Sequence, residues 1–331
     1  GKLRYAVRKA GMERSLAALR TEADAADIRL ALLEQYMQLF ELYRRQEVFS
    51  RNIEESERRL HDIRRMKEEG LITNNDVLRS EMQLTDDRLS LQRTQNDLVL
   101  ASQHLDILLG LRETLLIRPD TAILHRPIEL ESYETYVGEA YAGDPDLKRL
   151  RMQTELARND VALARSAIRP DVSLYASNML ARPVARTMED LYNNNWNVGL
   201  SVSVPLFALY KSRHKVRESR LAVALNRNAE EQEMQRLRLR VHTAYLRHRE
   251  AVQEVKALRL SARQAQENYR IMQNRYLNQL AILTDLLDAN SVRLNVELQL
   301  VTARTRVIYT YYQLQKLSLI HISEPTRLDV I

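Results

Sequence analysis

The hydrophobic pattern of residues 2–69 is that of one long helix. The stretch contains no proline. Its apolar side chains recur three and four positions apart, as at Ile28, Leu32, Leu33, Tyr36, Leu39, Phe40 and Tyr43. A helix of this length would run about 100 Å. The polar stretch Gly70–Leu78 interrupts it, because Gly70 can take the left-handed conformation that ends a helix. A second helix is predicted from about residue 76 to residue 109.

The break at Gly70–Leu78 recurs at Gln279–Leu287, 209 residues later. With this one offset and no gaps, Leu71 aligns with Leu280 and Asp76 with Asp285. The register also holds in the pairs Arg8/Arg217, Leu30/Leu239, Tyr36/Tyr245, Leu89/Leu298, Leu91/Leu300 and Leu105/Leu314. We infer the tandem duplication of a long helical hairpin.

The second copy has no glycine at its turn. Asn278 and Gln279 stand where the first copy has Glu69 and Gly70. Asparagine tolerates the left-handed conformation better than most residues. We therefore expect Asn278 to make the turn.

Between the two hairpins the pattern changes. Leu115–Pro119 reads as a short strand, and residues 129–142 and 145–168 as two shorter helices. Alternation of apolar with small polar residues then begins at Val172 and returns after a loop, in the series Trp196, Val198, Leu200, Val202 and Val204. About ten residues of such alternation are typical of a transmembrane β-strand. Periodicity alone fits a half-buried hairpin of a soluble protein equally well.

These elements together carry a resemblance to a known family. A long helix, a polar turn and a following aspartate occur in duplicate, with Gly70-Leu71 and Asp76-Val77-Leu78 in the first copy and Gln279-Leu280 and Asp285-Leu286-Leu287 in the second. Between the copies lie Pro170-Asp-Val-Ser-Leu-Tyr175 and the strand-like stretch Trp196–Phe207. The order of hairpin, connector, strand pair and hairpin resembles that of the TolC-like outer-membrane efflux proteins, over residues 1–316.

The resemblance implies a mainly α fold with a β-hairpin. Long duplicated helical hairpins would form the subunit of an α-barrel, and two strands would join a transmembrane β-barrel shared by a homotrimer. It divides the chain into a first hairpin of the periplasmic tunnel (1–109, tip near 70–76), an equatorial region (110–169), an outer-membrane β-hairpin (170–207) and a second hairpin (208–316, tip near 278–285).

Both ends of the chain shape further expectations. Gly1 aligns with Tyr210, just after the second copy's strands. We therefore expect a fragment that lacks the first copy's strand pair and any export signal. Leu317–Arg327 reads like a translated sequencing adapter, so residues 317–331 are expected to be a non-native tail.

Composition narrows the function. Cysteine is absent, which excludes disulfides and thiolate chemistry. The net charge of +6 arises from basic residues interleaved with acidic ones, which favours solvated helix faces over nucleic-acid binding. The histidines form no ligand-like cluster, and no nucleophile elbow or phosphate loop is present. We expect no enzyme, no catalytic residue, no metal and no cofactor.

The resemblance also assigns roles to residues of the tips. Asp285 and Asp288 share one helix face, and in the family the matching aspartates form a pore constriction, where carboxylate rings favour cations. The residues alone fit helix capping equally well. Tyr276 and Asp76 match family residues that hold the tip closed, but the family's third partner, an arginine, is replaced by Ala281. Docking of an adaptor protein is expected at the tip residues Gly70, Leu71, Gln279 and Leu280.

Two classes of function follow. The first is an outer-membrane channel of a Gram-negative bacterium, which passively exports small molecules or proteins in a tripartite efflux or type I secretion system. Its tips would meet a periplasmic adaptor and, through it, an inner-membrane pump. Its strands would face lipid at Trp196, Val198, Leu200 and Val202. The alternative is a soluble coiled-coil scaffold or periplasmic adaptor. The lack of charge between Trp196 and Phe207 favours the channel.

Overall fold

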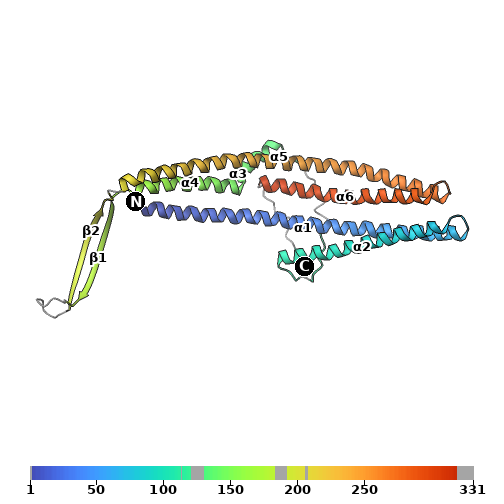
Figure 1. Cartoon of the computed structure of the whole chain (residues 1–331), viewed down its shortest axis with the longest axis horizontal. Coiled ribbons are helices and arrows are strands. Elements are labelled where there is room, and N and C mark those ends of the chain that lie inside the picture. The colour runs from blue at the N-terminus through green and yellow to red at the C-terminus, as the bar shows by residue number, and fades with distance from the viewer. Residues whose placement is uncertain (1, 113, 121–129, 183–191, 206–207, 319–331) are drawn as a thin grey trace. The chain divides into compact units, whose positions relative to one another are not determined.

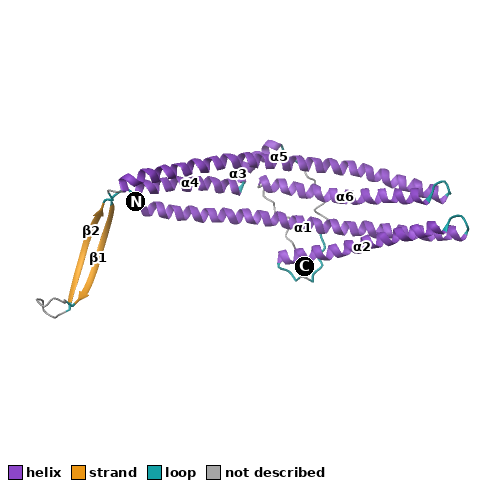
Figure 2. Ribbon diagram, viewed as in Figure 1, coloured by secondary structure: helices purple, strands orange, loops and turns teal. Residues whose placement is uncertain are grey.

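Six helices and two strands make up the described part of the chain. The computed structural model describes residues 2–112, 114–120, 130–182, 192–205 and 208–318. The helices are α1 (Lys2–Glu68), α2 (Asn74–Leu109), α3 (Tyr133–Gly143), α4 (Pro145–Ser166), α5 (Ala208–Leu277) and α6 (Leu283–Ser318), and the strands are β1 (Asp171–Ala181) and β2 (Asn193–Ser203) (Figure 1). Figure 2 shows how far helix predominates.

The element bounds repeat with the offset seen in the sequence. Helix α1 ends at Glu68 and α5 at Leu277, 209 residues apart. Helices α2 and α6 contain 36 residues each, and both of their bounds differ by the same 209. The predicted pair of helical hairpins is therefore confirmed. Helix α6 also runs through Leu317 and Ser318, the first two residues of the expected foreign tail, whose residues 319–331 lie outside the described residues.

The two turns use one hydrogen-bond pattern. Gly70 N–H donates to the Lys67 carbonyl (2.9 Å) and Leu71 N–H to that of Met66 (2.9 Å). In the second copy Gln279 N–H donates to Tyr276 (2.9 Å) and Leu280 N–H to Arg275 (2.7 Å). These two hydrogen bonds satisfy backbone carbonyl groups that the end of a helix leaves without a partner.

The left-handed residue of the second turn is Gln279, with φ 60°, where Gly70 has φ 76°. The expectation that Asn278 takes the left-handed conformation was wrong. The N–H of Asn278 still donates to the Asn274 carbonyl at 3.1 Å, and its side-chain amide donates to the same oxygen at 2.7 Å. Asn278 thus keeps a helix-type hydrogen bond just after the end of α5. The turn keeps the register of the first copy, although glutamine adopts the left-handed conformation less readily than glycine.

The connector departs from prediction at residues 115–119. These residues form no strand, because helix side chains take the backbone groups that a strand partner would occupy. Ser102 Oγ donates to the Leu115 carbonyl (3.1 Å) and accepts from Ile117 N–H (2.9 Å), while Tyr43 Oη donates to the Ile117 carbonyl (3.1 Å). The two shorter helices exist as α3 and α4, and α3 is capped by Ser132, whose hydroxyl accepts from Thr135 N–H. Residue 129, the expected start of α3, lies outside the described residues.

The two predicted strands pair in one antiparallel sheet. Leu174 lies opposite Leu200, Val172 opposite Val202, and Ala176 opposite Val198. Apolar residues therefore face apolar residues across the pair, since alternate residues share a face. Strand β1 runs to Ala181, and β2 begins at Asn193, three residues before the predicted alternation begins at Trp196.

The chain folds as two units, one of Gly1–Ala23 and Pro145–Arg236, the other of Asp24–Asp144 and Leu237–Ile331. In the first unit α4 contacts the N-terminal parts of α1 and α5. Lys9 pairs with Asp160 at 3.1 Å. On its other side Arg151 of α4 pairs with Glu230 of α5 at 3.2 Å.

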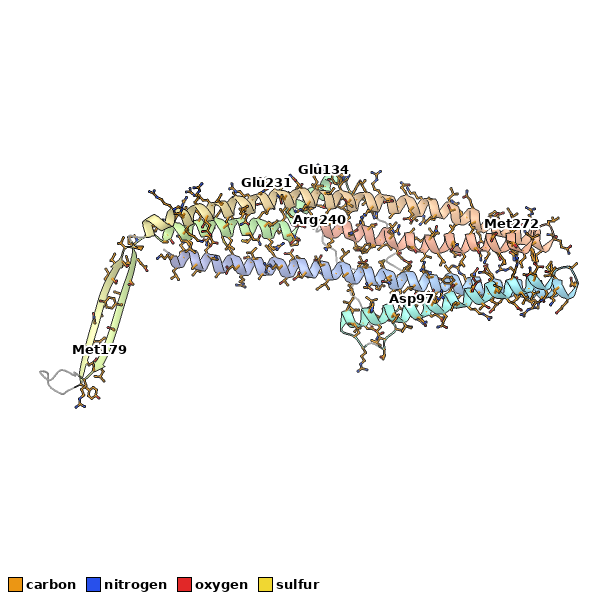
Figure 3. All side chains as sticks on the ribbon, in the orientation of Figure 1. Asp97, Glu134, Met179, Glu231, Arg240 and Met272 are labelled. Atoms are coloured by element: carbon orange, nitrogen blue, oxygen red, sulfur yellow. The ribbon has the colours of Figure 1, made fainter. Side chains whose placement is uncertain are left out.

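The core of the second unit joins both hairpins. Its buried residues come from all four long helices: Ile53, Leu60 and Ile63 of α1, Val77 and Leu84 of α2, Tyr269 and Tyr276 of α5, and Leu283, Leu286 and Ala289 of α6. Met272, labelled in Figure 3, packs against them. Helix α3 lies against α6, and its Glu134 pairs with Arg238 of α5 at 3.4 Å. Among the described residues, no helix has an apolar stretch long enough to cross a membrane.

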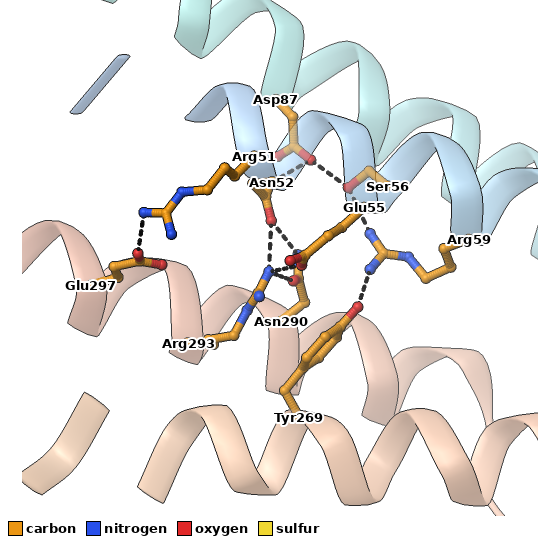
Figure 4. A network of polar contacts seen from close by, with 10 residues as sticks. All are labelled: Arg51, Asn52, Glu55, Ser56, Arg59, Asp87, Tyr269, Asn290, Arg293 and Glu297. Carbon is orange, nitrogen blue, oxygen red and sulfur yellow. Dashed lines mark hydrogen bonds and ion pairs between the residues drawn. The ribbon is translucent and has the colours of Figure 1, made fainter. Parts of the chain in front are cut away.

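A buried polar network links the same four helices (Figure 4). The carboxylate of Asp87, on α2, accepts hydrogen bonds from Asn52 (2.8 Å) and Ser56 (3.0 Å) of α1. Asn52 Oδ1 in turn accepts from Arg293 of α6 at 3.2 Å. Arg59 of α1 donates to Ser56 Oγ (2.8 Å) and to Tyr269 Oη of α5 (2.9 Å).

Removing the carboxylate at the centre of this network should destabilise the second unit. In Asp87→Ala the donors of Asn52 and Ser56 lose their acceptor in a buried site, so we expect the free energy of unfolding to fall by about 1 to 3 kcal/mol for each donor left unpaired. Urea denaturation followed by circular dichroism measures it. Asp86→Ala, at the exposed neighbouring position, is the matched control and should change stability by less than about 0.5 kcal/mol. Equal stability of the two variants would contradict the role given to Asp87.

His248 should make the second unit sensitive to acid. The side chain is 1% exposed and its Nδ1 lies 3.0 Å from Thr310 Oγ1. Burial lowers its pKa from 6.5, despite a backbone hydrogen bond with Val307 that acts the other way. His248 therefore binds a proton more readily in the unfolded chain than in the folded one. For this reason the free energy of unfolding decreases as the pH falls below about 6.5. Thermal unfolding midpoints should fall less between pH 7 and 5 in His248→Gln than in the parent, whereas the exposed-site control His61→Gln should follow the parent.

Candidate functional site

The start of α6 presents two unpaired carboxylates. Asp285 and Asp288 are exposed, and the side chain of neither takes part in a hydrogen bond or ion pair within the described ranges. Their neighbours Leu283, Leu286 and Ala289 are buried, which turns the two aspartates to the opposite, solvent side of the helix. Asp285 lies in the first turn, where negative charge suits the helix dipole. The structure thus places both predicted constriction residues on one open face.

Asp76, the aspartate aligned with Asp285, has a different environment. Its Oδ2 accepts from the backbone N–H of Thr73 (3.0 Å) and from the Thr73 hydroxyl (2.8 Å). These bonds hold the start of α2. Asp76 therefore stabilises the turn in which it lies. Its negative charge also affects Tyr276 of the second hairpin.

Tyr276 of α5 is a buried tyrosine whose pKa responds to the charge of Asp76. It is 5% exposed, and its hydroxyl has no hydrogen-bond partner in the described structure. Burial raises the pKa of Tyr276 from 10, and the carboxylate of Asp76 raises it further. The two residues expected to hold the tip are thus neighbours across the hairpins, without a hydrogen bond between them.

Arg79 makes a contact that the sequence reasoning missed. Its Nη1 donates to Thr284 Oγ1 at 2.8 Å, which ties α2 to the first turn of α6. Arg79 aligns with Asp288 under the 209-residue offset, so the first tip carries a positive side chain where the second carries a negative one. Ala281, which stands in place of the family's arginine, makes no such bond among the described residues.

The turns carry the residues expected to meet an adaptor. Leu71 and Leu280 follow the left-handed residues Gly70 and Gln279, and their side chains are 47% and 67% exposed. The same backbone hydrogen bonds fix both leucines. Each hairpin therefore presents one exposed apolar side chain at an equivalent place in a tight turn.

The strands expose their apolar face. Trp196, Val198, Leu200 and Val202, the residues expected to face lipid, are between 59% and 73% exposed. Gly199 lies on the other face, where the ring of Tyr175 from β1 covers it so closely that an added Cβ would come within 2.4 Å of the tyrosine hydroxyl. Met179 of β1, labelled in Figure 3, is also exposed.

Metal-ligating groups do not gather in the part of the chain that the structure describes, where no three His, Cys, Asp or Glu side chains could hold one ion. The tips and strands offer docking, electrostatic and apolar surfaces. Long duplicated helical hairpins combined with an exposed apolar strand pair are the architecture that the resemblance to outer-membrane efflux proteins implies.

The chain belongs to the outer membrane efflux protein family, whose model matches residues 136–318. This finding confirms the resemblance and assigns the chain to the outer membrane. The helices and the strand pair of the structure confirm the mainly α fold class. A comparison with curated proteins finds no match.

Solved structures share the fold. The outer membrane protein VceC of Vibrio cholerae has a TM-score of 0.81 at 20% identity, covering 96% of this chain and 76% of that one. A membrane protein of Pseudomonas aeruginosa has a TM-score of 0.82 at 18% identity (96% and 71%). The open-state MtrE channel of Neisseria gonorrhoeae has 0.78 at 16% (96% and 72%).

A pair of tyrosine substitutions tests the environment of the second tip. Tyr276→Phe removes a buried hydroxyl that has no partner, so the free energy of unfolding should rise by about 1 kcal/mol. Since the raised pKa of Tyr276 makes the fold lose stability as the pH rises above 10, the variant should also lose less stability there than the parent. Both effects are measured by urea denaturation at pH 8 and pH 10.5.

Tyr269→Phe is the matched control, because it deprives the buried Arg59 of one of its two hydrogen-bond acceptors. It should lower stability by about 1.5 to 3 kcal/mol. If Tyr276→Phe destabilises as much as Tyr269→Phe, the hydroxyl of Tyr276 has a partner and the account of the tip is wrong.

Proposed function

We propose that the chain is the subunit of a trimeric outer-membrane channel in a tripartite efflux or type I secretion system. Three copies would bring their helical hairpins together as a periplasmic tunnel and their strands as one closed sheet in lipid. Small molecules or proteins would pass through it passively. Family membership and the shared fold support this assignment.

The observation that carries the proposal is the pair of exposed, unpaired carboxylates at the start of α6. A helix cap needs one acidic residue in the first turn, but Asp288 lies beyond that turn and binds nothing in the described chain. Threefold symmetry would gather six carboxylates around one axis. Such a ring narrows a pore and favours cations over anions.

The tips would dock with a periplasmic adaptor that leads to an inner-membrane pump. Leu71 and Leu280 support this step, because exposed leucines in two equivalent turns offer an adaptor two similar apolar anchors. Gly70 and Gln279 would serve by holding those turns. Tyr276, Asp76 and Arg79 would then set how firmly the two hairpins stay together when the tunnel opens.

The outer-membrane lipid would cover the apolar strand face. Trp196, Val198, Leu200 and Val202 leave a continuous apolar surface exposed, and exposed apolar patches of this kind mark contact with a partner or a membrane. Their edge groups would be satisfied by strands of neighbouring subunits, since lipid offers no hydrogen bonds.

The channel proposal is tested by single-channel recording of trimers in planar bilayers. Removal of the carboxylate ring in the double variant Asp285→Ala, Asp288→Ala should raise conductance and abolish block by divalent or trivalent cations. The matched control is Asp86→Ala with Asp97→Ala, which removes the same charge from exposed positions of α2 and should leave the block unchanged. A double variant that conducts and is blocked like the parent would show that Asp285 and Asp288 only cap α6.

A further inference from the structure

A cavity of about 1200 Å³ opens within the second unit, between α1, α5 and α6. Its base is apolar. Phe40 and Val48 of α1, Val255 of α5 and Ile308 of α6 line it, and each is less than 9% exposed. The volume is ample for an organic molecule of ordinary ligand size.

Arginine dominates the charged residues of this cavity. Six arginines and four glutamates line it. Each glutamate already has an arginine partner: Glu47 with Arg44 (2.8 Å), Glu55 with Arg293 (2.6 Å), Glu267 with Arg270 (2.6 Å) and Glu297 with Arg51 (2.8 Å). The acidic side chains of the lining are therefore engaged, one of them by an arginine from outside the cavity.

Three lining arginines are left without a carboxylate among the described residues. They are Arg259 and Arg263 of α5 and Arg304 of α6. Arg259 and Arg263 stand four residues apart on one helix face, a spacing at which like charges destabilise a helix. Partial burial, followed by repulsion from Arg259 and Arg44, lowers the pKa of Arg304. Positive charge is thus concentrated here at a cost to the fold.

We propose that this cavity binds an amphipathic organic anion. The guanidinium groups of Arg304, Arg259 and Arg263 would hold its sulfonate, phosphate or carboxylate head. A guanidinium presents a planar set of donors that matches such oxyanions in pairs. The apolar body would lie on Phe40, Val48, Val255 and Ile308. The site is a property of the single chain and does not depend on conduction.

Isothermal titration of the full chain in a non-ionic detergent tests the proposal with three probes. Naphthalene-1-sulfonate should bind saturably, and its affinity should fall as NaCl rises because salt screens exposed charges. The cation 1-naphthylmethylammonium, of similar shape, should not bind. Inorganic sulfate should bind at least about tenfold more weakly, since it gains nothing from the apolar base.

Substitutions locate the site. Arg304→Met and Arg259→Met should each weaken naphthalene-1-sulfonate binding by about tenfold or more, the usual effect of losing a charge-assisted hydrogen bond. Arg306→Met is the matched control. It lies two residues along α6 from Arg304, pairs with Glu254 at 3.0 Å outside the cavity, and should bind the probe like the parent.

Stability separates lost binding from lost folding. Arg304→Met relieves repulsion among like charges, so its thermal unfolding midpoint should equal or exceed that of the parent. The proposal is overturned if the parent shows no saturable binding of naphthalene-1-sulfonate. This is the outcome expected if carboxylates of a second copy of the chain fill the cavity. It is also overturned if Arg304→Met binds like the parent, if the ammonium probe binds equally well, or if sulfate matches the sulfonate.

Discussion

The hydrogen bonds to the Asp87 carboxylate fix how the helices of the second unit meet. A buried carboxylate is costly unless donors surround it, and here Asn52 and Ser56 of α1 and Gln83 of α2 supply three. Asn52 then uses its carbonyl oxygen to bind α6. A shift of one helix by a turn would leave these groups buried and unpaired. Apolar packing tolerates such a shift better, so the network sets the register between the hairpins.

The network is not repeated in the two copies, although the turns are. Under the 209-residue offset Asp87 aligns with Val296, and Arg293 aligns with Leu84. Asp87 and Arg293 thus each bond to another helix and have an apolar counterpart in the other copy. Arg293 also lies 4.4 Å from the centre of the Tyr269 ring of α5. The duplication supplied two similar hairpins, and their later divergence made each one the specific partner of the other.

Local patterns allowed the sequence to predict the hairpins, the turns and the strand pair. The offset places the ends of α1 and α5, and the alternation around Trp196 and Leu174 gives the strand faces. Prediction failed where tertiary contacts decide the outcome. Ser102 and Tyr43 replace a strand partner for residues 115–119, and neither contact has a local signal. Likewise Asn52 and Asp87 look like ordinary polar positions of a solvated helix, since only the fold shows that they are buried. Asp285 and Asp288 were singled out from the sequence because the repeat and the resemblance mark their positions.

Paired and unpaired charges separate according to burial along α6. Arg293 is 7% exposed and bonds to Asn52, Asn290 and Glu55. Asp285, Asp288 and Arg304 are open to solvent and bind nothing acidic or basic in the described chain. Water can carry an unpaired charge at little cost, whereas a buried one must be neutralised. Arg304 departs from this rule in part, because like charges crowd it in a cavity. The charge of Arg304 lies among like charges and therefore does not stabilise this fold. For this reason the cavity is stronger evidence for a ligand than the exposed aspartates are by themselves.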